Sequence, residues 1–353
     1  MKFLRLFLIN LLVLAVLTLI VSIIAYFIGS YKINNFFKLK GKNQISYLKY
    51  DSIAMFVHKP NIKIYDNWGT PEQKLTTERR TNNLGFREDL DTENKKLPNE
   101  FRILVTGDSH TDGVLKHNYQ SFVNKWENKL NRTDSTVFYN CINGGTAYYT
   151  FRNYLGFLKK YKDLKPDIYL INIFTGNDFR ETFLYEDDRT SSKNVFKTIF
   201  IRTKRKFYSN TQKSIPPNQG LDQVLYFKHF PDDMETSLET AKKYISEIKS
   251  ICAEENIRLI ITLLPSKLET NSVFRNEIQS LFKLNDETID RNKKLTLLLS
   301  NWLDQQQIEY YDLKQPLKQA KKKVYWDEDL HINVEGHRVI SDHLFEVISS
   351  HVP

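Results

Sequence analysis

Residues 107 to 113 read Gly-Asp-Ser-His-Thr-Asp-Gly and follow directly on a short apolar run, residues 102 to 106. Branched and aliphatic residues closed by glycine are typical of a central strand in a parallel sheet. Open α/β sheets bind their ligands at the carboxyl ends of such strands. Ser109 therefore occupies a position where a serine can act as a nucleophile, although a Gly-Asp-Ser segment can also be a plain turn.

A serine nucleophile needs partners. Its unaided hydroxyl reacts poorly at neutral pH, so acyl transfer requires a base that takes the proton and donors that stabilise the oxyanion. The best-placed base is His331, in the segment Trp326-Asp-Glu-Asp-Leu-His just ahead of a helical pattern. We expect His110, which is adjacent to Ser109 on the turn, to point elsewhere. His337 and His343 fall on the predicted last helix, where packing or a surface position is the more ordinary explanation.

Two glycine- and asparagine-containing segments follow further strand-like runs. Residues 139 to 146 read Tyr-Asn-Cys-Ile-Asn-Gly-Gly-Thr, and residues 175 to 178 read Thr-Gly-Asn-Asp after the apolar run 167 to 174. Together with the serine and histidine segments, they resemble the SGNH, or GDSL, hydrolase family from about Thr81 to the C-terminus. The lead-in, residues 81 to 87, is similar to the stretch before the nucleophile strand in membrane-anchored members.

The resemblance implies that Ser109 is the nucleophile and His331 the base. It also implies an oxyanion hole made of the Ser109 N–H, the Gly145 N–H and the Asn177 side-chain amide. The physical requirements agree, because glycine lets the backbone approach a substrate closely and an asparagine amide donates without adding charge. The alternatives are an ordinary loop at Gly145 and a helix N-cap at Asn177.

The acid of the triad departs from the common family spacing, which puts an aspartate three residues before the histidine. Glu328 holds that place here, with Asp329 two residues before His331 and Asp327 four before. Anchored relatives and relatives similar to polysaccharide acetyltransferases use Asp-x-His, which Asp329 fits. We expect Asp329 to orient the imidazole and stabilise the imidazolium, with Glu328 as the second candidate.

The N-terminus predicts a membrane anchor. The segment Leu6 to Gly29 is almost entirely apolar and long enough to cross a bilayer core of roughly 30 Å as a helix. A cleaved signal peptide is the alternative, but the segment ends without a convincing small-x-small site. Lysine and arginine lie on both sides of it, so the positive-inside count does not decide the topology. We favour an inside N-terminus and an extracytoplasmic catalytic domain.

Composition fits one anchored domain. About 320 of the 353 residues follow the anchor, with mixed charge and no repeat, which is enough for one large core. The net charge of +9 comes from scattered Lys and Arg without a nucleic-acid recognition motif, so nucleic acid is not an expected partner. Cys141 and Cys252 lack metal-ligand spacing, and two buried thiols are favoured over a disulfide. No metal or other cofactor is predicted.

The remaining pattern alternates helices and strands. Helices are predicted over residues 234 to 256, 286 to 307 and 334 to 350, and strands over 136 to 139, 257 to 264 and 308 to 313. With right-handed crossovers, these elements make a three-layer α/β/α sandwich with at least five parallel strands, the flavodoxin-like fold of SGNH hydrolases. Ser109 and His331 should meet at the carboxyl face of the sheet.

Three parts are predicted along the chain. Residues 1–29 are the transmembrane anchor, 30–80 a linker and N-terminal extension, and 81–353 the SGNH/GDSL hydrolase domain. An insert at 184–230 carries the basic run 202 to 206 and two adjacent prolines, and could cap the site or form a solvated face.

The expected function is a membrane-anchored serine esterase that acts outside the cytoplasm through an acyl-enzyme on Ser109. O-acetyl groups of a polysaccharide are the favoured substrate, with other small-molecule or glycan esters included. An acyltransferase that uses the same triad is the runner-up. A catalytically inactive scaffold of the same fold is the third hypothesis, against which the intact set of serine, histidine, glycine and asparagine argues.

Overall fold

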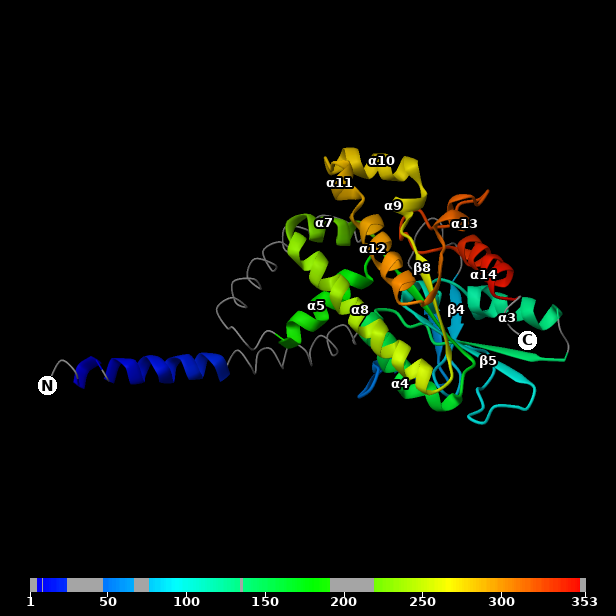
Figure 1. The fold of residues 1–353 in the computed structure, drawn as a ribbon, viewed down its shortest axis with the longest axis horizontal. Coiled ribbons are helices and arrows are strands. Elements are labelled where there is room, and N and C mark those ends of the chain that lie inside the picture. The colour runs from blue at the N-terminus through cyan, green and yellow to red at the C-terminus, as the bar shows by residue number, and fades with distance from the viewer. Residues whose placement is uncertain are drawn as a thin grey trace. The chain divides into compact units, whose positions relative to one another are not determined.

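The computed structural model describes residues 5–7, 9–23, 47–66, 76–133, 136–190 and 219–349. The chain forms two compact units, Met1–Leu48 and Lys49–Pro353 (Figure 1). In the first, the helix Arg5–Ile23 is long and apolar enough to cross a membrane, a property that a signal sequence would share. Its side chains are exposed to the surroundings. The last six residues of the predicted span, 24 to 29, lie outside the described part.

The second unit is built on a five-stranded parallel sheet, as predicted. Its strands lie in the order β6-β5-β7-β8-β9, and every neighbouring pair is parallel. The strands are β5 (Glu100–Gly107), β6 (Phe138–Asn143), β7 (Ile168–Phe174), β8 (Arg258–Leu264) and β9 (Glu309–Asp312). Because β5 lies between β6 and β7, the residues that follow β5 lie at the carboxyl edge of the sheet with a strand on either side. The strand predicted over 136 to 139 in fact begins at Phe138 and continues to Asn143.

Helices cover both faces of the sheet, which gives the predicted three layers (Figure 1). One face carries α3 (Phe122–Thr133) and α14 (Val334–Ile348), and the other carries α4 (Phe151–Tyr161), α5 (Asp178–Thr190), α8 (Pro231–Glu254) and α12 (Arg291–Gln305). Side chains alternate across a strand. Ile103 and Val105 of β5 accordingly pack in one core cluster with Trp126 of α3. Burial of such apolar residues on both faces is what the near-continuous hydrophobic strands predict.

Shorter elements connect these layers. They are α2 (Ser109–Asp112), η2 (Asn118–Gln120), η3 (Lys162–Leu164), α7 (Leu221–His229), α9 (Lys267–Thr270), α10 (Ser272–Leu281), α11 (Asp286–Ile289) and α13 (Lys314–Lys318). The helix predicted over 286 to 307 is two helices, because α11 ends before Asp290 and α12 begins after it. Of the predicted insert, α5 and α7 form the two ends, and its centre, with the basic run and the two prolines, lies outside the described residues.

The segment predicted as a linker is partly folded onto the catalytic unit. It contains two strand pairs, β1 (Leu48–Asp51) with β2 (Met55–His58) and β3 (Lys63–Asp66) with β4 (Thr77–Arg80). The carbonyl oxygen of Phe56 accepts a hydrogen bond from the Tyr149 hydroxyl at 2.8 Å, and that of Ala54 accepts one from Asn153 Nδ2 at 3.0 Å. Residues from Lys49 onward accordingly belong to the same compact unit as the sheet.

Candidate active site

Three predicted residues from distant parts of the chain meet in a line of hydrogen bonds. Ser109 Oγ lies 2.8 Å from Nε2 of His331. The other ring nitrogen of His331, Nδ1, lies 3.0 Å from Oδ2 of Asp329. This is the arrangement in which a carboxylate holds an imidazole in the tautomer that can accept the serine proton.

The sheet places the serine. Ser109 is the first residue of α2 and follows β5 after a single residue, Asp108, whose side chain accepts the His110 N–H at 2.9 Å. Gly107 is the last residue of β5, and a larger residue does not fit there, because an added Cβ would lie 2.1 Å from Thr111 Oγ1. The first N–H groups of a helix have no acceptor within it, so the Ser109 N–H is available to a substrate oxygen by its position in α2.

A short turn places the acid and the base. Leu330, between Asp329 and His331, adopts a left-handed backbone conformation with φ 63°. Asp329 can therefore bind its neighbour twice, since Oδ1 accepts the His331 N–H at 2.9 Å while Oδ2 faces the ring. A left-handed leucine is uncommon and costs free energy, which is typical of functional turns. The Asp-x-His spacing is thus built into the backbone.

The two rival acids point elsewhere. Glu328 is exposed, and Asp327 binds Lys267 Nζ at 2.8 Å and Lys323 Nζ at 2.5 Å. Burial of Asp329 opposes its ionisation, but the hydrogen bonds and charge of His331 outweigh this and lower the pKa of the carboxyl. Asp329 is consequently ionised at neutral pH and able to stabilise the imidazolium.

The two predicted oxyanion donors are engaged with other groups in this structure. The Gly145 N–H donates to Asn143 Oδ1 at 3.0 Å, and an added Cβ at Gly145 would lie 2.4 Å from the Asp112 nitrogen. Asn177 Nδ2 lies 3.3 Å from Glu181 Oε1. Both residues follow the carboxyl ends of strands that flank β5. The single Gly145 N–H must change acceptor before it can bind an oxyanion, whereas the Asn177 amide has a second N–H besides the one directed at Glu181.

His110 has a role that the sequence did not suggest. Its ring packs between Phe174, at 4.1 Å between centroids, and His331, at 4.6 Å. Its Nδ1 accepts the Ile332 N–H at 3.2 Å. Burial lowers the pKa of His110 well below its usual range, so the ring is neutral. The His110 ring therefore packs against the imidazole of His331, and His331 is the ring that contacts Ser109 Oγ.

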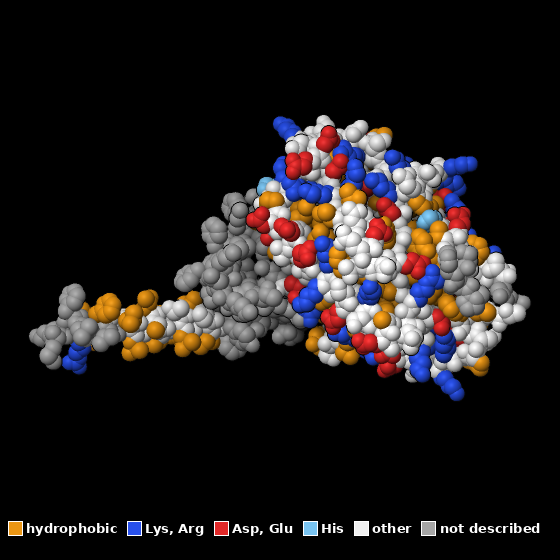
Figure 2. Space-filling model, viewed as in Figure 1, with side chains coloured by type: hydrophobic (Ala, Val, Ile, Leu, Met, Phe, Trp, Pro, Cys, Tyr) orange, Lys and Arg blue, Asp and Glu red, His pale blue; other side chains and the backbone are white. Residues whose placement is uncertain are grey.

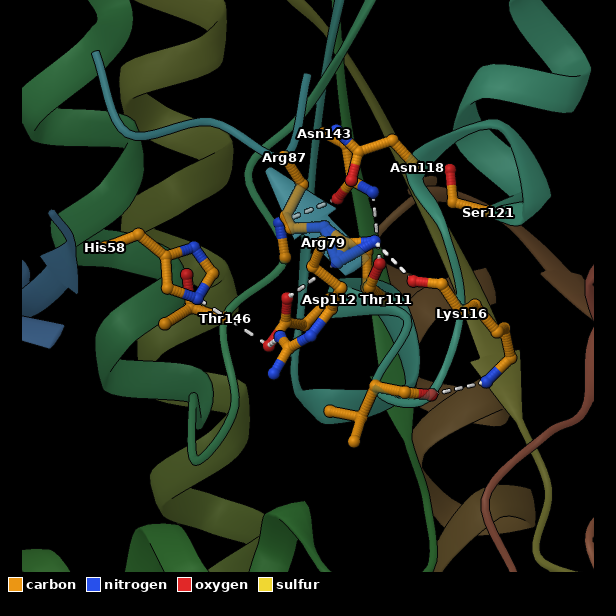
Figure 3. A network of polar contacts seen from close by, with 12 residues as sticks. His58, Arg79, Arg87, Thr111, Asp112, Lys116, Asn118, Ser121, Asn143 and Thr146 are labelled. Carbon is orange, nitrogen blue, oxygen red and sulfur yellow. Dashed lines mark hydrogen bonds and ion pairs between the residues drawn. The ribbon is translucent and has the colours of Figure 1, made fainter. Parts of the chain in front are cut away.

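A buried ionic network fixes the far end of the nucleophile helix (Figure 3). Asp112, the last residue of α2, accepts a hydrogen bond from Arg79 Nη1 at 2.7 Å, and His58 and Arg87 lie 3.6 and 3.7 Å from its carboxylate. Arg79 also binds Asp66 through two nitrogens, at 2.5 and 3.0 Å. Burial opposes the charge on Asp112, but the arginines outweigh it and the pKa is lowered.

The same network reaches the catalytic acid. Asp66 Oδ2 accepts the Leu115 N–H at 3.1 Å, just beyond α2. Lys116 is fully buried and donates to the Val114 carbonyl at 2.7 Å. Burial lowers the pKa of Lys116 to about 7, and attraction to Asp329 opposes that shift. The strands β3 and β4 therefore supply the charges of Asp66 and Arg79 near the nucleophile turn. No sequence motif indicates this role for the two residues.

We expect Arg79→Met to be strongly destabilising. The change leaves Asp66 and Asp112 buried without their main partner, which typically costs about 3–5 kcal/mol. Urea unfolding of the protein measures the loss. The matched control is Arg80→Met on the same strand, where the side chain is about half exposed and pairs with Glu78. Equal stability of the two variants would contradict a structural role for the network.

The described residues contain no group of three or more His, Cys, Asp or Glu side chains placed to hold a metal ion. Cys141 and Cys252 are both buried and free, as expected.

Comparisons with known proteins gave structural likeness only. No protein-family model matches the chain, and no curated protein matches its sequence. Similar solved structures include a GDSL-like lipase from Bacteroides thetaiotaomicron, with 15% identity and a TM-score of 0.39 over 71% of this chain and 89% of that one. A catalytic mutant of an acetylxylan esterase from Geobacillus stearothermophilus has 13% identity and a TM-score of 0.44 over 72% and 95%. A putative acylhydrolase from Bacteroides fragilis has 13% and 0.39 over 73% and 90%.

Proposed function

We propose that this chain is a serine hydrolase that cleaves carboxylic esters through an acyl-enzyme on Ser109. The observation that carries the proposal is the hydrogen-bonded line from Ser109 Oγ through His331 to Asp329. A structural serine has no need of a base in contact with its hydroxyl and a carboxylate behind that base. The combination is the one that acyl transfer requires.

In the first half of the reaction, Ser109 Oγ attacks the ester carbonyl while His331 Nε2 takes its proton. The tetrahedral intermediate collapses, the bond to the alcohol breaks, and His331 returns the proton to the leaving oxygen. In the second half, water gives a proton to His331 and attacks the acyl-enzyme. Ser109 then recovers its proton and the carboxylic acid leaves. Asp329 stays ionised throughout.

The oxyanion of each intermediate needs donors. We propose the Ser109 N–H, the Gly145 N–H and the Asn177 amide for this role, because these three residues follow the carboxyl ends of neighbouring strands. The Gly145 N–H must leave Asn143 when a substrate oxygen arrives, and the Asn177 amide can offer its second N–H while the first stays on Glu181.

The proposed substrate is a glycan that carries O-acetyl groups, with hydrolysis favoured over transfer. Purified protein should release free acid from p-nitrophenyl acetate, and the rate should fall as the acyl chain of the ester lengthens. Glycan acceptors distinguish the runner-up. If acid release falls while acylated glycan accumulates, the acyl-enzyme is resolved by a sugar hydroxyl and the protein is a transferase. Failure to cleave any ester would leave the inactive scaffold.

We further propose that the apolar N-terminal helix is retained and anchors the catalytic unit outside the cytoplasm. Its length and exposed apolar side chains support this. The full-length protein should stay in the membrane fraction through a high-salt wash. Recovery of a soluble form that begins near residue 30 would show cleavage instead.

A further inference from the structure

A second cavity lies beside the loop that carries the catalytic histidine. Its volume is about 120 Å³, and it is formed by α9, the end of α13 and the segment that precedes His331. Its lining includes Lys267, Lys318, Lys322, Lys323 and Asp327. No step of the proposed hydrolysis uses this cavity.

The cavity wall carries an excess of positive charge. Asp327 pairs with two of its lysines, Lys267 and Lys323. Lys318 and Lys322 are exposed at its rim, and the charge of Lys322 acts on Glu335 of α14. Figure 2 shows Lys and Arg side chains projecting from the part of the surface over α13 and the segment after it. The lining thus contains four lysines and one aspartate, and two of those lysines pair with that aspartate.

The cavity and the triad share one short turn. Lys267 Nζ lies 3.4 Å from the carbonyl oxygen of Trp326, whose N–H donates to the His331 carbonyl at 2.9 Å. Tyr325 pairs with Ile332 as an isolated antiparallel bridge, and its hydroxyl donates to the Pro265 carbonyl at 2.7 Å. One side of the turn, at Trp326, therefore contacts Lys267, and the other side carries the base His331.

We propose that this lysine pocket binds an anionic group of the glycan whose ester is cleaved at Ser109, which makes the substrate class an acidic glycan rather than a neutral one. The inference rests on the proposed function. The group recognised is a carboxylate or a phosphate on a sugar near the acylated one. Lysine suits either, because its ammonium is a compact point charge that does not demand a planar partner.

The test compares one polymer in two charge states. O-acetylated polygalacturonate carries a carboxylate on each sugar, and the carboxyl-reduced form of the same polymer carries none. We expect the full-length protein to have a kcat/KM about 10-fold higher on the acidic form, which corresponds to about 1.4 kcal/mol. Added salt should shrink the difference, because screening weakens exposed charge pairs. A parallel experiment measures kcat/KM on O-acetylated poly(ribitol phosphate). Comparison with O-acetylated polygalacturonate shows whether phosphate is preferred to carboxylate.

The variant Lys318→Ala/Lys322→Ala should lose most of that preference through a higher KM, while its rate on p-nitrophenyl acetate stays unchanged. The control is Lys242→Ala/Lys243→Ala on α8, which removes the same charge elsewhere and should behave as wild type.

Equal kcat/KM on the acidic and reduced polymers would overturn the proposed binding of an anionic group in the lysine pocket. If no ester is cleaved at all, the proposed function fails, and calorimetric binding of unacetylated polygalacturonate to the two double variants then decides the pocket by itself. A loss of binding confined to Lys318→Ala/Lys322→Ala supports it, and equal binding overturns it.

Discussion

Replacing Ser109 with alanine is expected to abolish ester cleavage and covalent labelling together. The side chain that forms the acyl-enzyme is lost, and loss of the nucleophile in a serine hydrolase lowers kcat by on the order of 10⁶. A fluorophosphonate probe followed by mass spectrometry locates the labelled residue, and p-nitrophenyl acetate hydrolysis measures turnover. Folding should be retained, because the change removes one hydroxyl group with its hydrogen bond to His331 and leaves the backbone of α2 unaltered.

The control for this experiment is Ser250→Ala on the exposed side of α8, which should leave labelling and turnover unchanged. A Ser109→Ala protein that still cleaves esters at the wild-type rate would contradict the proposed nucleophile. It would also remove the basis for both the hydrolase and the transferase. Labelling of a different serine in the wild-type protein would have the same consequence.

The second large effect is expected for Asp329→Asn. An asparagine can donate to His331 Nδ1 and so favours the tautomer whose Nε2 already carries a proton, which cannot accept one from Ser109. The loss in kcat is about 10⁴ in a triad of this kind. Glu328→Gln removes an exposed carboxylate that lies outside the triad and should change turnover little.

The same pair of variants tests the assignment of the acid. A larger loss in Glu328→Gln than in Asp329→Asn would give the orienting role to Glu328. Thermal unfolding of both proteins separates a catalytic effect from a structural one. Interactions with His331 lower the pKa of Asp329 and keep it ionised at neutral pH, so Asp329→Asn removes a negative charge from beside the imidazole.

Much of the fold could be read from local patterns. The strands β5, β7 and β8 are continuous apolar runs, and helices α8 and α14 show helical periodicity, so their bounds agree with prediction within a few residues. The helices α3, α4 and α10 were not predicted, and among the three helices predicted by bounds, the one over 286 to 307 differs by an interruption. Asp290 breaks it into α11 and α12, and no glycine or proline marks that break.

The site was predictable only where residue type and motif order carry information. Ser109, Asp329 and His331 follow one another in the order that a resemblance could identify, and the structure joins all three by hydrogen bonds. Gly145 and Asn177 lie near the expected strand ends, but their donors bind Asn143 and Glu181. Hydrogen-bond direction depends on side-chain rotamers and neighbours, which a motif does not specify.

Two features of the site were decided by tertiary structure alone. The ions that pair with Asp112 and flank α2 come from β3 and β4, in a segment that the sequence predicts as a linker and N-terminal extension without indicating which charges are buried. Charged residues are expected on a surface, and a sequence does not reveal which of them fold inward to pair. His110 likewise became a packing partner of His331 because α2 and the turn before α14 meet there.

The sequence by itself determined the chemistry that this protein can attempt: a serine after a buried strand, a histidine two residues after an aspartate, and an apolar N-terminal helix. These are local properties of residue type and spacing. Only the tertiary structure decided which acid faces the base, which charges are buried and where four lysines gather beside the histidine. Such choices depend on contacts between segments that are distant in the sequence: Ser109 and His331 are 222 residues apart, and Arg79 and Asp112 are 33 apart. Burial then strengthens the electrostatic interactions of each charge.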